Sequence, residues 1–319
     1  MDSSAPLFCI QMKDRQTLSY IFAALAILAW STVSTAFKLS LQHFTPIGLL
    51  LFSSFIATLF LVIYNAISTP TAFRKIPANC LRSLPAGLLN PFLYYVLLFT
   101  AYSRLRAQEA QALNYTWAIV LSLFSVFLLK EKFRFKDLLM LLLSFLGVMI
   151  ISTKGQIQNL EFDDALGTAL ALGSSVIWAL YWIVSLKDKR ASTVKLLYNF
   201  MVGFILILLY ATLSRTPILI QGAIVHRALF TGVWVGIFEM GLTFVLWLKA
   251  LELTENTAKI SNLVFITPFL SLLLIRSVLS EAIHPATIIG LSLIVASNLI
   301  QKSGAFSKKA KISRKISTK

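Results

Sequence analysis

The stretch ALFTGVWVGIFEMGLTFVLWL, residues 228–248, carries a single charge, Glu239. Apolar runs of this kind recur about ten times along the chain, and a helix needs about 20 residues to cross roughly 30 Å of hydrocarbon. A carboxylate at bilayer depth costs roughly 2.5–3.5 kcal/mol, so an acid held there is expected to face a polar cavity or a partner. The stretch therefore predicts a membrane protein with a solute pathway.

Composition and charge spacing agree with this prediction. Of the 319 residues, 57% are hydrophobic and 13% are charged, with a mean hydropathy of +0.79. Soluble domains carry about 25% charged residues, so this class is excluded. Uncharged gaps of 22, 21 and 22 residues follow Arg15, Arg82 and Asp164. Each gap is long enough for one membrane-spanning helix.

The pattern predicts an all-α integral membrane protein with ten transmembrane helices. The predicted spans are residues 18–37, 46–67, 85–103, 109–129, 138–153, 165–186, 196–213, 228–248, 257–275 and 285–301. The alternating short segments of outer-membrane barrels do not occur in the sequence.

The net charge of +16 is explained by topology rather than by a nucleic-acid partner. With a cytoplasmic N-terminus, the inner segments hold 22 of the 29 Lys and Arg residues. The positive-inside rule then predicts a protein of the cell (inner) membrane with both termini in the cytoplasm. The basic tail, residues 302–319, is interpreted as a disordered topology determinant, with contact to anionic lipid as the alternative.

An internal repeat divides the chain into two halves. Its markers are two residue pairs at an offset of 148, Trp30 with Trp178 and Asn114 with Asn262, and one pair at an offset of 150, Glu131 with Glu281. Because each half holds an odd number of spans, the halves are expected to insert in opposite senses, as inverted-repeat transporters do. The alternative is ten helices with chance coincidences.

The repeat also sets the predicted domain boundaries. They are a cytoplasmic N-terminal segment (1–17), a first five-helix repeat (18–153), a linker loop (154–164), a second five-helix repeat (165–301) and the cytoplasmic tail (302–319).

Several short motifs resemble the drug/metabolite transporter superfamily, in its ten-helix EamA branch, and within it the bacterial aromatic amino-acid exporters. The motifs are Trp30-Ser31-Thr32, Trp178-Ala179-Leu180-Tyr181, Glu109 ahead of Asn114-Tyr115-Thr116-Trp117, and Pro268 in the ninth span. One departure is Ala118, where the exporter group has a proline. The resemblance implies a cavity among spans 1, 3, 4, 6, 8 and 9, and export as the direction of transport.

Ten residues are predicted to bind substrate. They are Trp30, Asn90, Tyr94, Asn114, Trp117, Trp178, Tyr181, Glu239, Lys259 and Asn262. In the fourth span, helical spacing places Asn114 and Trp117 on one face. In the sixth, Trp178 and Tyr181 form an aromatic wall suited to amphipathic solutes, with packing or an interfacial belt as the alternative.

Backbone and ionisable features add further expectations. Asn90-Pro91 predicts a kink in the third span, with the Asn90 amide either satisfying freed backbone groups or reaching a ligand. Glu239 is expected to titrate or to anchor a substrate amino group.

Lys259 either extends toward water or pairs with a carboxylate. Glu109 is a weaker candidate that caps its helix, and Gly232 with Gly236 predicts close helix packing rather than dimerisation.

No motif argues for an enzyme, a cofactor or a bound metal. The sequence has no phosphate-binding loop, no HExxH and no Cys-x-x-Cys, and the three histidines fall in predicted loops. We therefore expect a secondary transporter of small amphipathic metabolites, most notably amino acids, that works by alternating access with protons as the candidate coupling ion. The alternatives are a carrier of S-adenosylmethionine or a nucleotide derivative, and a non-transporting membrane protein.

Overall fold

The computed structural model describes residues 4–128, 135–156 and 164–300. Glu131, the last stretch of the predicted linker loop before Asp164, and the basic tail lie outside these residues. Within the described ranges the regular structure is helical, with one isolated bridge between Phe44 and Leu219.

Seven helices in the described part of the chain are long and apolar enough to cross a membrane. They are Asp14–Ser40, Pro46–Ser68, Ile76–Arg104, Ala165–Lys187, Ser192–Leu213, Val225–Leu253 and Lys259–Leu279. The other three predicted spans coincide with shorter helices: α6 (Ala107–Asn114) with α7 (Trp117–Leu128), α8 (Phe135–Ser152), and Pro285–Ile300. A helical multi-span protein is thus confirmed, whereas the count of ten and the inverted arrangement stay predictions.

Several spans are interrupted. The first span consists of α1 (Ser4–Ser31) and α2 (Val33–Ser40), and the third consists of α4 (Ile76–Gly87), η2 (Leu88–Leu93) and α5 (Tyr94–Arg104). The eighth span consists of α11 (Val225–Trp234), η3 (Val235–Gly241) and α12 (Leu242–Leu253). The ninth span consists of α13 (Thr257–Leu263), η4 (Val264–Ile266) and α14 (Thr267–Leu279). By contrast, α3 (Pro46–Ser68), α9 (Ala165–Lys187) and α10 (Ser192–Leu213) are continuous, and η1 (Pro70–Phe73) follows α3. With the fourth span, five of the six spans expected to line a cavity are discontinuous, which is typical of transporter binding regions.

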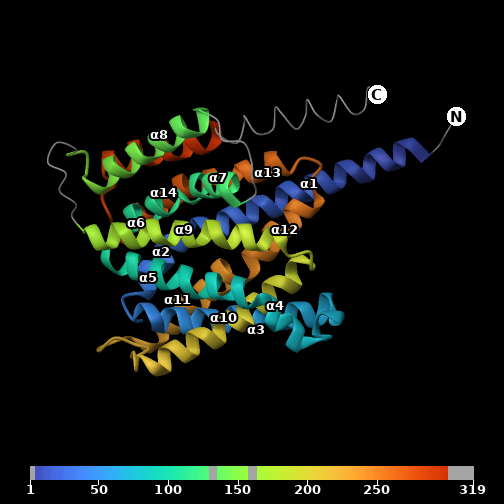
Figure 1. Ribbon diagram of the computed structural model, residues 1–319, viewed down its shortest axis with the longest axis horizontal. Helices are drawn as coiled ribbons and strands as arrows, with labels where there is room; N and C mark the ends of the chain where they lie inside the picture. Colours follow the sequence, from blue (N-terminus) through green and yellow to red (C-terminus); the bar gives the residue numbers. More distant parts are fainter. Residues whose placement is uncertain (1–3, 129–134, 157–163, 301–319) are drawn as a thin grey trace. The chain divides into compact units, whose positions relative to one another are not determined.

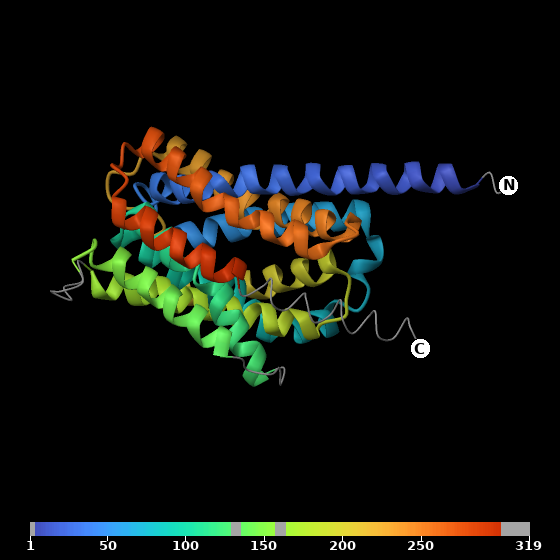
Figure 2. The same cartoon turned by 90° about the horizontal axis from the view of Figure 1, so that it is seen from above.

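The helices form two compact units that each combine segments from both sequence halves. The first unit comprises Met1–Leu84 and Arg190–Leu279. In it, α1 lies beside α12 and α14, as Figure 2 shows, and α3 packs against α10 and η3. Small residues allow the approach of α1 to α12: Ala23 and Ala250 are fully buried, and the Ser19 hydroxyl donates to the Ala250 carbonyl at 2.7 Å.

Two further contacts stabilise the first unit. The Arg190 guanidinium donates to Ser83 Oγ at 2.7 Å and to the Asn79 carbonyl at 3.0 Å, and lies 5.9 Å from the centre of the Tyr198 ring, so it ties α4 to the start of α10. Gly232 and Gly236 pack against α3, where an added Cβ at Gly236 would lie 2.7 Å from the Ser53 carbonyl oxygen. The glycine pair therefore serves close packing within the chain.

The second unit comprises Pro85–Lys189 and Ser280–Lys319, with α9 at its centre. Helices α5, α6 and α7 all pack against α9. Asp164 caps the N-terminus of α9 by accepting from the Gly167 N–H at 2.8 Å, and it pairs with Arg104 at 2.9 Å. The cap and the neighbouring guanidinium hold the pKa of Asp164 below its ordinary value.

Candidate functional site

A chain of side-chain hydrogen bonds joins three helices of the second unit. The Tyr94 hydroxyl on α5 donates to Asn114 Oδ1 on α6 at 3.2 Å. The Asn114 amide in turn donates to Ser174 Oγ on α9 at 2.8 Å, and Ser174 donates to the Ala171 carbonyl. Amide and hydroxyl groups that pair with one another in an apolar environment can exchange these partners for those of a polar ligand.

Aromatic rings lie directly beside this hydrogen-bond chain. The ring centres of Tyr94 and Trp178 are 4.6 Å apart, and those of Trp178 and Tyr181 are 5.4 Å apart. Tyr94 and Tyr181 are buried, whereas Asn114 and Trp178 are half-buried. The structure thus brings four of the ten predicted site residues, Tyr94, Asn114, Trp178 and Tyr181, together with Ser174, and we call these five residues the amide–aromatic cluster.

Asn114 lies at an interruption in the fourth span, and the prediction of one continuous helix over residues 109–129 was wrong. α6 ends at Asn114 and α7 begins at Trp117. At the break, the Thr116 hydroxyl bonds the Leu113 carbonyl and Ser175 Oγ, and the Asn298 amide donates to the Tyr115 carbonyl. Helical spacing therefore does not place the half-buried Trp117 on the same face as Asn114.

Asn90 occupies the predicted kink in the third span. Its backbone is extended, with φ −142° and ψ 121°, and Pro91 follows it through a cis peptide bond. The side chain is fully buried, and neither its amide nitrogen nor its amide oxygen has a hydrogen-bond partner among the residues that the structure describes. The kink is confirmed, but the amide does not satisfy the freed backbone groups.

The remaining predicted residues belong to the first unit. Glu239 is buried, with 9% of its surface exposed, on the π-helical turn η3, a type of distortion that is frequent at functional sites. Trp30 packs against Phe244 and Trp247. The Lys259 side chain is exposed, and Asn262 is half-buried.

Glu109 caps the N-terminus of α6, as the sequence predicted. Its carboxylate accepts from the Arg106 N–H in the first turn of α6. The neighbouring Ala107 N–H is bonded by Glu281, a marker of the sequence repeat. Both acids therefore satisfy free backbone donors at a helix start.

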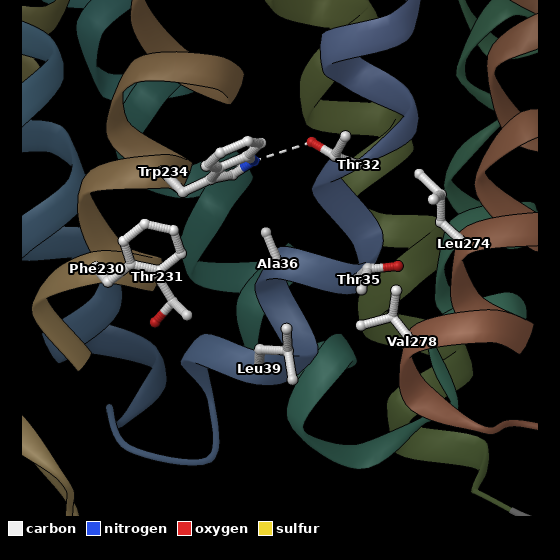
Figure 3. A pocket seen from close by; sticks show the side chains of 9 residues that line it. All are labelled: Thr32, Thr35, Ala36, Leu39, Phe230, Thr231, Trp234, Leu274 and Val278. Carbon is white, nitrogen blue, oxygen red and sulfur yellow. Dashed lines mark hydrogen bonds between the residues drawn. The ribbon is translucent and has the colours of Figure 1, made fainter. Parts of the chain in front are cut away.

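A cavity of about 220 Å³ lies between α2, α11 and α14 in the first unit. Figure 3 shows Phe230 and Trp234 on one side, Leu274 and Val278 on the other, and Ala36 between them. The remaining lining residues are Thr32, Thr35, Leu39 and Thr231. The Trp234 indole N–H donates to Thr32 Oγ1 at 2.9 Å, which joins α11 to the break between α1 and α2.

Sequence reasoning did not identify the residues that shape this cavity, nor Ser174 in the amide–aromatic cluster. One signal was available for the cavity. Phe230, Trp234 and Phe238 recur every fourth residue, and their rings form a continuous ladder with centre distances of 6.1 and 4.4 Å. Serine and threonine in apolar helices gave no comparable signal, because most of them bond their own backbone.

Comparisons with known proteins agree with a transport role. The model of the EamA-like transporter family matches residues 17–153 and 165–300. An uncharacterized transporter of Clostridium kluyveri is 26% identical over 305 residues, which cover 93% of this chain and 96% of the relative. An uncharacterized transporter of Archaeoglobus fulgidus is 23% identical over 283 residues, covering 85% and 93%. A protein of known crystal structure shares the fold, with a TM-score of 0.63, 20% identity, and coverage of 92% of this chain and 98% of that one.

Proposed function

We propose that this protein, which belongs to the EamA-like transporter family, is a secondary transporter that exports small amphipathic metabolites, with amino acids as the first candidates. Its location is the cell (inner) membrane with both termini in the cytoplasm, as its charge distribution favours. It works by alternating access, and the interrupted helices supply places at which the backbone can bend.

The observation that carries this proposal is the amide–aromatic cluster. Tyr94, Asn114 and Ser174 offer hydroxyl and amide groups that can bind a carboxylate or an amino group without a fixed charge. The half-buried Trp178, which packs between the rings of Tyr94 and Tyr181, offers its accessible ring surface to the apolar part of the same molecule. A neutral polar edge beside aromatic rings binds an amphipathic solute moderately, which a carrier needs in order to release it.

Glu239 is the proposed ionisable group of the transport cycle. It is a buried acid within a helix that is apolar enough to span the membrane, and such residues mark proton relays or ligand counter-ions. We assign it to proton coupling or to the binding of an ammonium group.

A thermal-shift screen of the purified protein tests the substrate class. A ligand that binds the native protein at 100 times its Kd stabilises it by about 2.7 kcal/mol. We expect amino acids to raise the melting temperature of the wild-type protein, and to have a smaller effect on Asn114→Leu. A response to S-adenosylmethionine or nucleotide derivatives alone would overturn the substrate assignment. Absence of any ligand response together with absence of solute flux would instead support the non-transporting alternative.

A further inference from the structure

We propose that the cavity between α2, α11 and α14 is a second binding site, for a compact aromatic molecule that carries one uncharged hydrogen-bonding group, such as a phenol or an indole. The proposal does not depend on the identity of the transported solute. The cavity has no charged lining residue, so a zwitterionic amino acid would lose its hydration there without compensation.

The cavity is apolar although three threonines line it, because the hydroxyl groups of two of them are already hydrogen-bonded to other protein groups. Thr32 Oγ1 donates to the Ala29 carbonyl at 2.7 Å and accepts from Trp234 Nε1. Thr231 Oγ1 donates to the Arg227 carbonyl at 2.9 Å. Of the three lining threonines, Thr35 alone has a hydroxyl without a hydrogen-bond partner in the described part of the chain. A buried water needs two to four polar partners, so a single hydroxyl does not hold one well, and the cavity favours an apolar occupant.

The size of the cavity limits that occupant. An apolar cavity of about 150 Å³ admits benzene, and this one measures about 220 Å³. It therefore has room for one ring with a substituent or for a small fused ring. The faces of Phe230 and Trp234 form one wall, and ring-to-ring contacts contribute beyond the buried area.

The Thr35 hydroxyl is the proposed hydrogen-bond partner of the single polar group of the ligand. The residue is 6% exposed and its hydroxyl oxygen is itself buried; Figure 3 shows this oxygen directed toward α14 and away from Phe230 and Trp234. Threonine in a helix populates two side-chain rotamers, so this hydroxyl can turn to meet a ligand. Access is open at the rim, because Phe230 and Val278 are 67% and 53% exposed.

Fluorescence quenching by 4-bromophenol tests this site, because bromine quenches a tryptophan that it contacts, and Trp234 lines the cavity. We expect saturable quenching in the wild-type protein. Ala36→Leu, which fills the cavity, should abolish it. The matched control Ala24→Leu adds the same bulk at an exposed position of α1 and should leave it unchanged. Thr35→Val should weaken binding about fivefold, as expected for one lost hydrogen bond, and Thr35→Ser should restore it.

Two results would overturn the proposal. One is quenching that rises without saturation and equally in all variants, as partition into the bilayer would produce. The other is quenching of Trp234 by bromine-labelled phospholipid chains that phenol fails to relieve, which would identify a lipid chain as the occupant. If Ala36→Leu does not fold, Val278→Trp at the exposed rim provides the second blocking variant.

Discussion

The Asn114 amide donates to Ser174 Oγ at 2.8 Å and so joins the end of α6 to the middle of α9. Asn114 also accepts from Tyr94, whereas Ser174 donates within its own helix, to the Ala171 carbonyl. Asn114 is therefore the residue on which the cluster depends.

The Asn114–Ser174 pair predicts a non-additive stability effect. Asn114→Ala, Ser174→Ala and the double variant should be compared by thermal unfolding in detergent. Because the two side chains bond each other, we expect a coupling free energy of about 0.5–3 kcal/mol. Strictly additive losses would show that this hydrogen bond does not contribute to the stability of the protein.

Removal of the Tyr94 hydroxyl should affect substrate binding. Tyr94→Phe keeps the ring beside Trp178 but loses the donor to Asn114. We expect a several-fold weaker affinity for the substrate and a smaller change in the melting temperature. Tyr20→Phe, at an exposed position of α1, is the matched control and should bind as the wild type does. Equal affinities in both variants would exclude Tyr94 from the site.

The close crossing of α8 and the helix Pro285–Ile300 should be sensitive to a single methyl group. An added Cβ at Gly147 would lie 2.6 Å from the Gly290 carbonyl oxygen, so Gly147→Ala should destabilise the protein by about 1–3 kcal/mol. In the control Gly173→Ala, the nearest atom lies at 3.5 Å, and the better helix propensity of alanine should leave stability equal or higher. Similar melting temperatures for the two variants would contradict this packing.

Asp164 predicts a pH-dependent contribution to stability. Its folded-state pKa lies below the ordinary value of 3.8, so its stabilising contribution is complete above that value and is lost as the pH falls through the folded-state pKa. Asp164→Asn keeps a capping oxygen but loses the charge that pairs with Arg104. The melting temperature of the wild type should exceed that of Asp164→Asn at neutral pH, and the difference should vanish in acid. A difference that persists in acid would contradict the assignment.

Glu239→Gln should change the pH dependence of transport. If the acid binds a proton or an ammonium group during the cycle, its neutral replacement should flatten the pH profile of uptake into liposomes. Glu255→Gln, at an exposed position after α12, serves as the control for loss of one carboxylate. An unaltered pH profile and rate in Glu239→Gln would remove Glu239 from the mechanism.

Features set by local chemistry could be predicted from the sequence. Long apolar runs predicted the seven helices of the described residues that are long enough to cross a membrane. Asn90-Pro91 predicted the break in the third span, because proline lacks a backbone donor wherever it occurs. Glu109 was identified as a capping residue for the same kind of reason.

Features set by distant partners could not be predicted in this way. The break after Asn114 contains neither proline nor glycine, and it depends on Ser175 and Asn298, which are remote in sequence. The repeat likewise indicated two halves, but the compact units combine helices from both. The cavity at Trp234 is formed by α2, α11 and α14 together. The helical spacing of residues within one helix does not show which other helices lie beside it.

Solute flux in reconstituted liposomes tests the transporter assignment and its site most directly. Purified protein should be incorporated into liposomes loaded with unlabelled amino acids, and exchange of labelled amino acids should be followed over time. We expect saturable, protein-dependent exchange that Asn114→Leu lowers at least several-fold and that Tyr20→Phe leaves unchanged. Exchange by folded Asn114→Leu at the wild-type rate and affinity, or no exchange of any amphipathic metabolite by the wild type, would contradict this expectation.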